Sequence, residues 1–162
     1  HIVREKLDEG FEDVDEFISF SLSVQNRRKS RMGYALENHL QAVFDRNGVD
    51  YSYNPVTENQ SRPDFLFPGI EQYRNSSFPR DRLHMLGAKS TCKDRWRQIL
   101  NEADRIERKH LCTLEPGISE NQTREMQASD VQLVVPDPIQ GTYADGQQSW
   151  LISVEGFLAT VR

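Results

Sequence analysis

Residues 86–102 read Leu86-Gly-Ala-Lys-Ser-Thr-Cys-Lys-Asp-Arg-Trp-Arg-Gln-Ile-Leu-Asn-Glu102, and the rest of the chain is organised around this stretch. Its first residues are apolar and include a glycine, which is typical of the end of a buried strand. The stretch then becomes polar, and apolar residues recur at helical spacing: Trp96, Ile99, Leu100, Ala103 and Ile106. We therefore expect a strand that ends at Lys89 and a long helix from about Thr91 to Lys109, with Glu102 well inside that helix.

Three charged residues are expected to meet near the ends of these strands. Asp64 follows Pro63 at the start of a second apolar run, and Lys89 interrupts an apolar strand, where burial is costly without an anionic partner. Two of the three have an ordinary structural interpretation: Asp64 as a turn or strand-edge residue, and Glu102 as a helix surface residue. Together they fit a metal-dependent phosphodiesterase, because two carboxylates can hold a hard divalent cation and a lysine can stabilise charge near a phosphate.

The remaining sequence alternates between helical and strand patterns. Helices are expected over residues 2–9, 13–24, 30–46 and 150–161, with one turn at 70–75 and a short helix that Ser119 opens. Strands are expected over residues 49–53, 63–67, 82–89, 111–114 and 131–135, and a polar loop over 141–148. This order predicts an α/β fold with a central mixed sheet of about four or five strands flanked by helices.

Composition indicates a polar globular domain. The chain has 162 residues, of which 36% are hydrophobic and 28% are charged, so we expect a single domain over residues 1–162. Because it begins with His1, we expect it to be a fragment, or a trimmed domain, of a longer protein. The sequence contains neither a membrane span nor a signal peptide, and its two cysteines predict free thiols in a cytoplasmic protein. The histidines lack zinc-ligand spacing.

The charge is unevenly distributed along the chain. The net charge of −5 argues mildly against a nucleic-acid partner, but local basic patches matter more than the total. Basic residues cluster at 27–31, 89–97 and 105–109, whereas much of the acid lies at 5–16. A DNA-facing side is therefore compatible with the composition.

The combination of Pro63-Asp64, Lys89 and Glu102 resembles the PD-(D/E)xK nucleases. The usual family pattern has an acid two residues before the lysine, where this chain has Gly87, but one branch carries that acid on the following helix, and Glu102 fits that branch. The segment Lys89-Ser-Thr-Cys-Lys93-Asp94-Arg95 resembles restriction endonucleases that read CC/GG pairs, such as PspGI and NgoMIV. Two further segments resemble the catalytic C-terminal domain of the EcoRII type: Tyr34-Ala-Leu-Glu37-Asn-His and Pro63-Asp64-Phe-Leu-Phe-Pro-Gly.

The resemblance implies that the chain is the C-terminal part of a longer protein, with a restriction-endonuclease-like fold and a set of catalytic residues. Asp64 and Glu102 would coordinate Mg²⁺, and Lys89 would polarise the scissile phosphate or the attacking water. Glu37 would be an additional acid that orients water or binds a second ion; the alternative for Glu37 is a solvated helix face. Because residues two apart on a strand face the same side, we also expect an acid placed at position 87 to replace Glu102 in part.

The resemblance also implies a base-reading segment at Lys93, Asp94 and Arg95. Arginine can donate two hydrogen bonds to guanine and aspartate can accept one from cytosine, so this trio suits adjacent G·C pairs. The alternative is that these residues only begin a helix. Tyr73 either packs in the interior or contacts DNA near the site.

These features together predict a type II restriction endonuclease domain. The expected partner is double-stranded DNA, cut at a short site that the resemblance gives as 5′-CCWGG, and a symmetric site favours a homodimer. Two rivals remain: a repair or junction-resolving nuclease of the same fold, and a non-cleaving DNA-binding module.

Overall fold

A computed structural model describes residues 14–18 and 32–162, without the side chains of residues 32–34, 93 and 94. Residues 14–18 are helical, within the helix expected over 13–24, whereas the helix expected over 2–9 lies outside the described residues. The later elements are α3 (Met32–Arg46), β1 (Ser52–Tyr53), η2 (Glu58–Gln60), β2 (Phe65–Phe67), α4 (Ile70–Arg74), η3 (Arg80–Arg82), β3 (His84–Lys89), η4 (Lys93–Asn101), β4 (Lys109–Thr113), α5 (Glu120–Ala128), β5 (Val131–Val134), α6 (Asp137–Gln140), α7 (Asp145–Gln148) and α8 (Val154–Val161).

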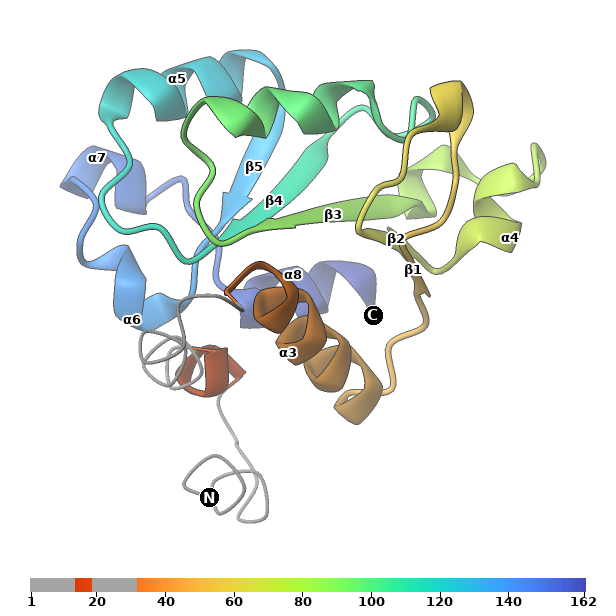
Figure 1. Cartoon of the computed structure of the whole chain (residues 1–162), viewed down its shortest axis with the longest axis horizontal. Coiled ribbons are helices and arrows are strands. Elements are labelled where there is room, and N and C mark those ends of the chain that lie inside the picture. Colours follow the sequence, from red (N-terminus) through yellow and green to blue (C-terminus); the bar gives the residue numbers. More distant parts are fainter. Residues whose placement is uncertain (1–13, 19–31) are drawn as a thin grey trace.

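The strands form one mixed sheet in the order β1-β2-β3-β4-β5. The pairs β1–β2 and β2–β3 are antiparallel, and the pairs β3–β4 and β4–β5 are parallel. Helix α5 and the 3₁₀ helix η4 cover one face, and α3 and α8 cover the other (Figure 1). The expected α/β fold with a mixed central sheet is confirmed.

An aromatic cluster holds α3 and α8 against the sheet. Phe65 and Phe67 are two residues apart in β2 and therefore share a face. Phe44 of α3 meets their rings edge-on at centroid distances of 5.1 and 5.2 Å, and Phe157 of α8 lies 5.3 Å from Phe67. On the opposite face, the apolar stripe of the central stretch packs inward, with Trp96 and Ile99 each 1% exposed.

The long helix expected from Thr91 to Lys109 is wrong. The structure has a 3₁₀ helix that ends at Asn101, followed by Glu102 in extended backbone (φ −98°, ψ 147°) and Ala103 with φ +51°. Lys109 is the first residue of β4, where it pairs with Val131. Because β4 pairs in parallel between β3 and β5, the chain must leave the helix before Lys109. The apolar residues up to Ile106 nevertheless have helical spacing.

Two smaller differences lie near the C-terminus. The polar loop expected over residues 141–148 contains α7, and α6 precedes it. The last helix begins only at Val154, with the Ser153 side chain accepting a hydrogen bond from Gly156 N, because Ile152 instead bridges to Val134 in parallel pairing. The expected start of α5 is confirmed, since the Ser119 side chain accepts from Gln122 N.

Both cysteines, Cys92 and Cys112, are buried and neither forms a disulfide bond, as expected. Within residues 14–18 and 32–162, no helix combines the length and apolar character that a membrane crossing requires.

Candidate active site

Asp64 lies beside the middle of β3. The antiparallel register of β2 and β3 pairs Phe65 with Leu86, so the residue before β2 lies next to Gly87 and Ala88. There Ala88 N donates a hydrogen bond of 2.7 Å to Asp64 Oδ2. Burial raises the pKa of the Asp64 carboxyl, while this backbone donor acts to lower it. The bond fixes the orientation of the carboxylate.

Glu102 reaches the same place from the end of η4. Burial and repulsion from Asp64 raise the pKa of Glu102 to about 7, and the nearby cations Lys89 and Lys109 act in the opposite direction. Mutual repulsion of this kind requires the two carboxylates to lie close together. The structure therefore brings Asp64 and Glu102 together, although the backbone that delivers Glu102 is a 3₁₀ helix and a turn.

Lys89 completes this group at the carboxyl end of β3. It is half-buried, and its charge acts on both Asp64 and Glu102. The anionic partners expected for a lysine at this position are thus present.

Glu37 lies on the side of the site formed by α3. Its charge helps to raise the pKa of Asp64, and Tyr53 Oη donates a hydrogen bond of 2.6 Å to Glu37 Oε1. Glu37 is therefore close enough to act on Asp64, and an exposed tyrosine of the edge strand holds it.

The two carboxylates suit a hard cation whose remaining coordination positions are filled by other oxygen atoms. Among the residues that the structure describes, no three His, Cys, Asp or Glu side chains are grouped to hold a metal ion. Mg²⁺ does not need such a cage, because it retains several waters and is commonly bound by one or two carboxylates and a substrate phosphate. Asp64 and Glu102 provide two such carboxylates, and a bound cation would offset their mutual repulsion.

Tyr73 lies inside the protein. It is 3% exposed, its hydroxyl donates to Glu58 Oε1 at 2.6 Å, and Arg105 N donates to the same hydroxyl at 3.1 Å. The Arg105 guanidinium binds the carbonyl oxygens of Tyr73, Asn75 and Phe78. The packing role considered for Tyr73 is therefore the one that its burial supports. Lys109, whose charge acts on both Glu102 and Glu58, also adjoins the site; the sequence placed it only in the basic cluster at residues 105–109.

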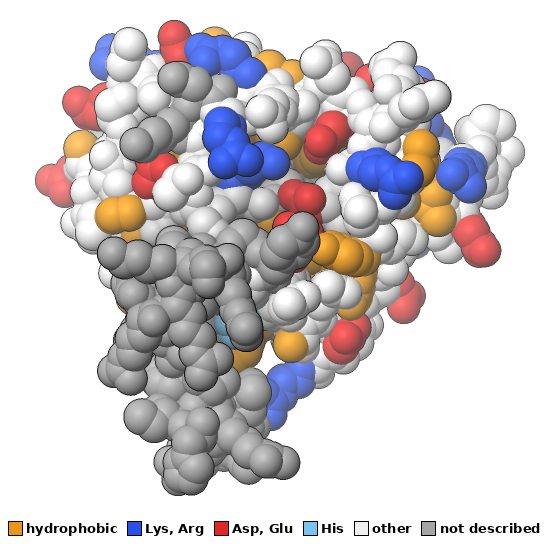
Figure 2. All heavy atoms as spheres, viewed as in Figure 1, with side chains coloured by type: hydrophobic (Ala, Val, Ile, Leu, Met, Phe, Trp, Pro, Cys, Tyr) orange, Lys and Arg blue, Asp and Glu red, His pale blue; other side chains and the backbone are white. Residues whose placement is uncertain are grey.

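The segment that was expected to read bases opens η4. The side chains of Lys93 and Asp94 lie outside the described residues, and Arg95 is exposed. Nearby, Arg97 stacks over Trp96 at 4.6 Å and pairs with Glu125 at 2.6 Å. Figure 2 shows basic and acidic side chains interspersed over this face rather than gathered in one basic patch. The basic cluster at residues 27–31 is outside the described residues.

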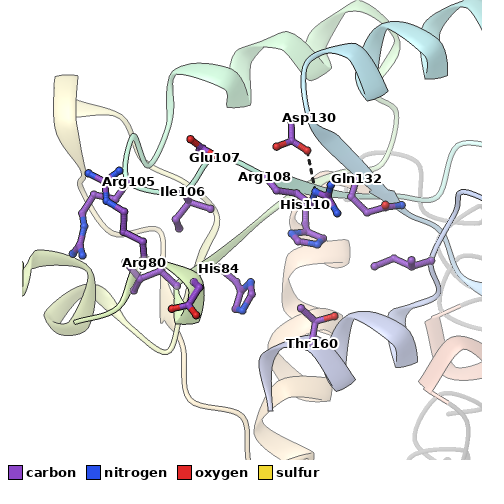
Figure 3. Close-up of a pocket in the computed structure, with 13 residues that line it drawn as sticks. Arg80, His84, Arg105, Ile106, Glu107, Arg108, His110, Asp130, Gln132 and Thr160 are labelled. Carbon is purple, nitrogen blue, oxygen red and sulfur yellow. Dashed lines mark hydrogen bonds and ion pairs between the residues drawn. The ribbon is translucent and has the colours of Figure 1, made fainter. Parts of the chain in front are cut away.

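A cavity of about 640 Å³ lies at the other end of the sheet. It is lined at the amino ends of three strands by His84, His110 and Gln132, together with Arg80, Arg105 and Arg108 (Figure 3). Three acids, Asp81, Glu107 and Asp130, offset the arginines, and Arg108 pairs with Asp130 at 2.9 Å. Neither Asp64, Glu102 nor Lys89 lines this cavity, so it is separate from the candidate site.

Gly87 lies in a tight contact with η4 and β4. A Cβ atom there would lie 3.1 Å from Ile99 Cγ2 and 3.3 Å from Leu111 Cδ1. A glutamate at this position would push into the apolar contact between η4 and the sheet. The partial replacement of Glu102 by an acid at position 87 stays a prediction, and it requires the Ile99 and Leu111 side chains to give way.

Comparisons with known proteins identify the family of this chain. Residues 1–158 match the family model described as EcoRII C terminal. The chain is 48% identical over 151 residues to the type II restriction enzyme EcoRII of Escherichia coli, covering 93% of this chain but only 37% of that enzyme.

Two similar solved structures are of metal-depleted Ecl18kI, one with uncleaved, modified DNA and one with uncleaved DNA. Their TM-scores are 0.70 and 0.68 at 21% and 22% identity. They cover 90% and 86% of this chain, which spans 49% and 47% of theirs. This likeness shows that the two proteins share a fold.

Proposed function

This chain belongs to the EcoRII C-terminal family, and from that premise we propose that it is the catalytic domain of a Mg²⁺-dependent type II restriction endonuclease. The observation that carries the proposal is the convergence of Asp64, Glu102 and Lys89 at β3. The proposed reaction is hydrolysis of a DNA phosphodiester, in which water forms a new bond to phosphorus as one P–O ester bond breaks.

In this proposal each side chain of the site has a separate task. Asp64 and Glu102 hold Mg²⁺, which when bound supplies positive charge to the phosphate and acidifies a water. The Asp64 carboxylate is oriented for this by its bond from Ala88 N. Lys89 places its ammonium against the scissile phosphate, and Glu37 orients water from the α3 side.

We propose that base reading falls to Lys93, Asp94 and Arg95, and that the target is 5′-CCWGG. EcoRII, to which the chain is 48% identical, supports this assignment, and so does the exposure of Arg95 at the start of η4. Arg95 would contact guanine and Asp94 cytosine in the major groove. A homodimer would place one active site on each strand of a symmetric target.

The test is cleavage of a plasmid that carries one 5′-CCWGG site, with Mg²⁺ and with EDTA, followed by sequencing of the ends. We expect ends at that site, no cleavage in EDTA, and no cleavage by Asp64→Asn at any Mg²⁺ concentration. Asp64→Asn should still bind the duplex, because it removes a cation ligand and leaves the base-reading segment intact. Cleavage by Asp64→Asn at the wild-type rate would refute the site.

The two rivals give different results in the same assay. A repair or junction-resolving nuclease would produce ends unrelated to CC/GG pairs. A non-cleaving DNA-binding module would retard the duplex in a gel and leave the plasmid intact.

A further inference from the structure

Lys109 is a lysine buried beneath the candidate active site. It is 5% exposed, and the β3–β4 register pairs Gly87 with Leu111. Since residues two apart share a face, Lys109 lies on the face of Gly87 and Lys89, which η4 covers. Its neighbour His110 faces the other way, with its ring 5.1 Å from that of Phe157.

The Lys109 ammonium holds together the turn that follows Glu102. It donates to Ala103 O at 2.8 Å and to Ile106 O at 2.5 Å, and Ile106 N donates to the same Ala103 carbonyl at 2.9 Å. Ala103 is fully buried and has φ +51°, a left-handed backbone that is unfavourable for a residue with a Cβ. Such a conformation persists where surrounding bonds fix it, and Lys109 supplies two of them.

The backbone on the other side of Glu102 is also held. Ser61 Oγ donates to Asn101 O at 3.2 Å, and Glu102 N donates to Ile99 O at 3.1 Å. Glu102 therefore lies between one anchor from the loop after η2 and another from Lys109. Because Glu102 lies in a turn rather than in a helix, these hydrogen bonds are what fixes the position of its backbone, and thus of its carboxylate.

Lys109 also places a buried positive charge near the carboxylates. Its charge acts to lower the pKa of both Glu102 and Glu58. The Lys109 ammonium thus opposes the rise in the pKa of Glu102 that burial and Asp64 cause, in agreement with its position beside the Glu102 turn.

We propose that Lys109 is the positioning residue for Glu102: its buried ammonium fixes the 103–106 turn and thereby sets the Glu102 carboxylate at the cation site. This inference rests on the proposed function, because it takes Glu102 to be a metal-binding residue. A lysine that merely stabilised the fold would leave metal affinity unchanged once the protein is folded.

The test compares Lys109→Met with Arg108→Met. Arg108 is the adjacent basic residue, but it is exposed, pairs with Asp130 and lines the separate cavity (Figure 3). Mn²⁺ binding to each protein without DNA is measured from the electron paramagnetic resonance signal of the free ion. We expect Lys109→Met to bind about 10- to 100-fold more weakly, as is typical when an outer partner of a metal ligand is lost. Arg108→Met should match the wild type.

Glu102→Gln is measured in parallel to separate the two proposals. If Glu102→Gln weakens Mn²⁺ binding and a folded Lys109→Met does not, the positioning role is wrong and the proposed function stands. If Glu102→Gln binds Mn²⁺ like the wild type, the assigned ligand pair is wrong, and the role of Lys109 fails with it. If both variants lose affinity but the wild type cuts no DNA, the positioning role stands and the nuclease proposal fails.

Hydrogen exchange in the wild-type protein keeps the inference testable if Lys109→Met does not fold. The Ile106 amide, which donates to Ala103 O, should exchange as slowly as amides in β4. Ser77 N, bound only to the Asn75 side chain among the described contacts, gives the fast reference. Ile106 exchange as fast as that of Ser77 would mean that the turn is not fixed, and would overturn the proposal.

Discussion

At the residue scale, the charge state of Glu102 would couple the stability of the fold to binding of the proposed metal ion. Burial and Asp64 raise the pKa of Glu102 to about 7, so the metal-free protein carries this group partly protonated near neutral pH. A bound cation requires the ionised form. Without a metal ion, the repulsion between Asp64 and Glu102 would therefore lower the stability of the fold. Their affinity for the proposed metal ion would increase as the pH rises.

The first prediction follows from the sign of that shift. The folded pKa of Glu102 lies above its ordinary value of 4.5, so its contribution to stability is complete below about pH 4.5 and is lost as the pH rises through about 7. In EDTA, the melting temperature of the wild type relative to Glu102→Gln should fall between pH 5 and pH 8. Adding Mg²⁺ at pH 8 should raise the melting temperature of the wild type and not that of the variant. A difference independent of pH would contradict the raised pKa.

The second prediction concerns Arg95. Arg95→Ala should lose about 1–3 kcal/mol of preference for the CC/GG site over random duplex, because a bidentate contact to guanine distinguishes base pairs. Competition binding at fixed salt gives this ratio. Arg97→Ala is the matched control, since Arg97 belongs to the same helix but pairs with Glu125 and stacks over Trp96. Equal losses on specific and random DNA would show that Arg95 contacts only phosphate.

At the scale of elements, a buried carboxylate joins three helices. Asp15, within the helical residues 14–18, is fully buried and accepts hydrogen bonds from Asp137 N at 3.0 Å, Val154 N at 3.0 Å and Glu155 N at 3.1 Å. These donors are the unpaired amides of the first turns of α6 and α8. One side chain thereby caps two helices and ties both to the N-terminal part of the chain.

The third prediction is that Asp15→Ala costs about 2–4 kcal/mol of unfolding free energy, because three amides lose their acceptor and two helices lose a cap. Asp15→Asn should cost less, since one acceptor oxygen remains. Glu16→Ala, at an exposed neighbour, is the control, and urea unfolding is the measurement. A loss for Asp15→Ala no larger than that for Glu16→Ala would show that these bonds contribute little.

The elements differ in how well the sequence predicts them. The strands around Phe65, Leu86 and Val131 and the α5 cap at Ser119 follow from local patterns, because apolar runs and capping residues act over a few neighbours. The turn at Ala103 does not, because an alanine in left-handed backbone depends on bonds from Lys109 that arise only once β4 has paired. Asp15 contacts residues far along the chain and for the same reason gave no signal.

The site shows the same division. Asp64, Lys89 and Glu102 were expected together because of their places at strand ends and after β3, and because of the family resemblance, and the structure brings them together. The path of the backbone to Glu102 was expected to be helical, since Trp96, Ile99 and Ala103 fit a helical stripe. Buried side chains at positions 96, 99 and 103 satisfy a 3₁₀ helix followed by a turn equally well, so the spacing could not distinguish the two.

At the scale of the whole molecule, one domain can provide one cation site, and cutting a duplex requires two hydrolyses. The described residues include a single convergence of Asp64, Glu102 and Lys89. A symmetric target presents the same bond on each strand, related by a twofold axis. Two copies of the chain would therefore act on one site.

The last prediction uses mixed dimers. Wild type and Asp64→Asn are mixed, allowed to exchange subunits, and added with Mg²⁺ to a supercoiled plasmid that carries one target site. A mixed dimer holds one active and one inactive site, so it should nick one strand and yield open circles, with a fraction that rises and then falls as Asp64→Asn is increased. Sedimentation with a target duplex should give two chains per duplex. If the active species were independent monomers, the variant would only dilute the wild type, and the fraction of open circles would show no maximum. A complex of one chain per duplex that made linear product in a single step would contradict the symmetric dimer.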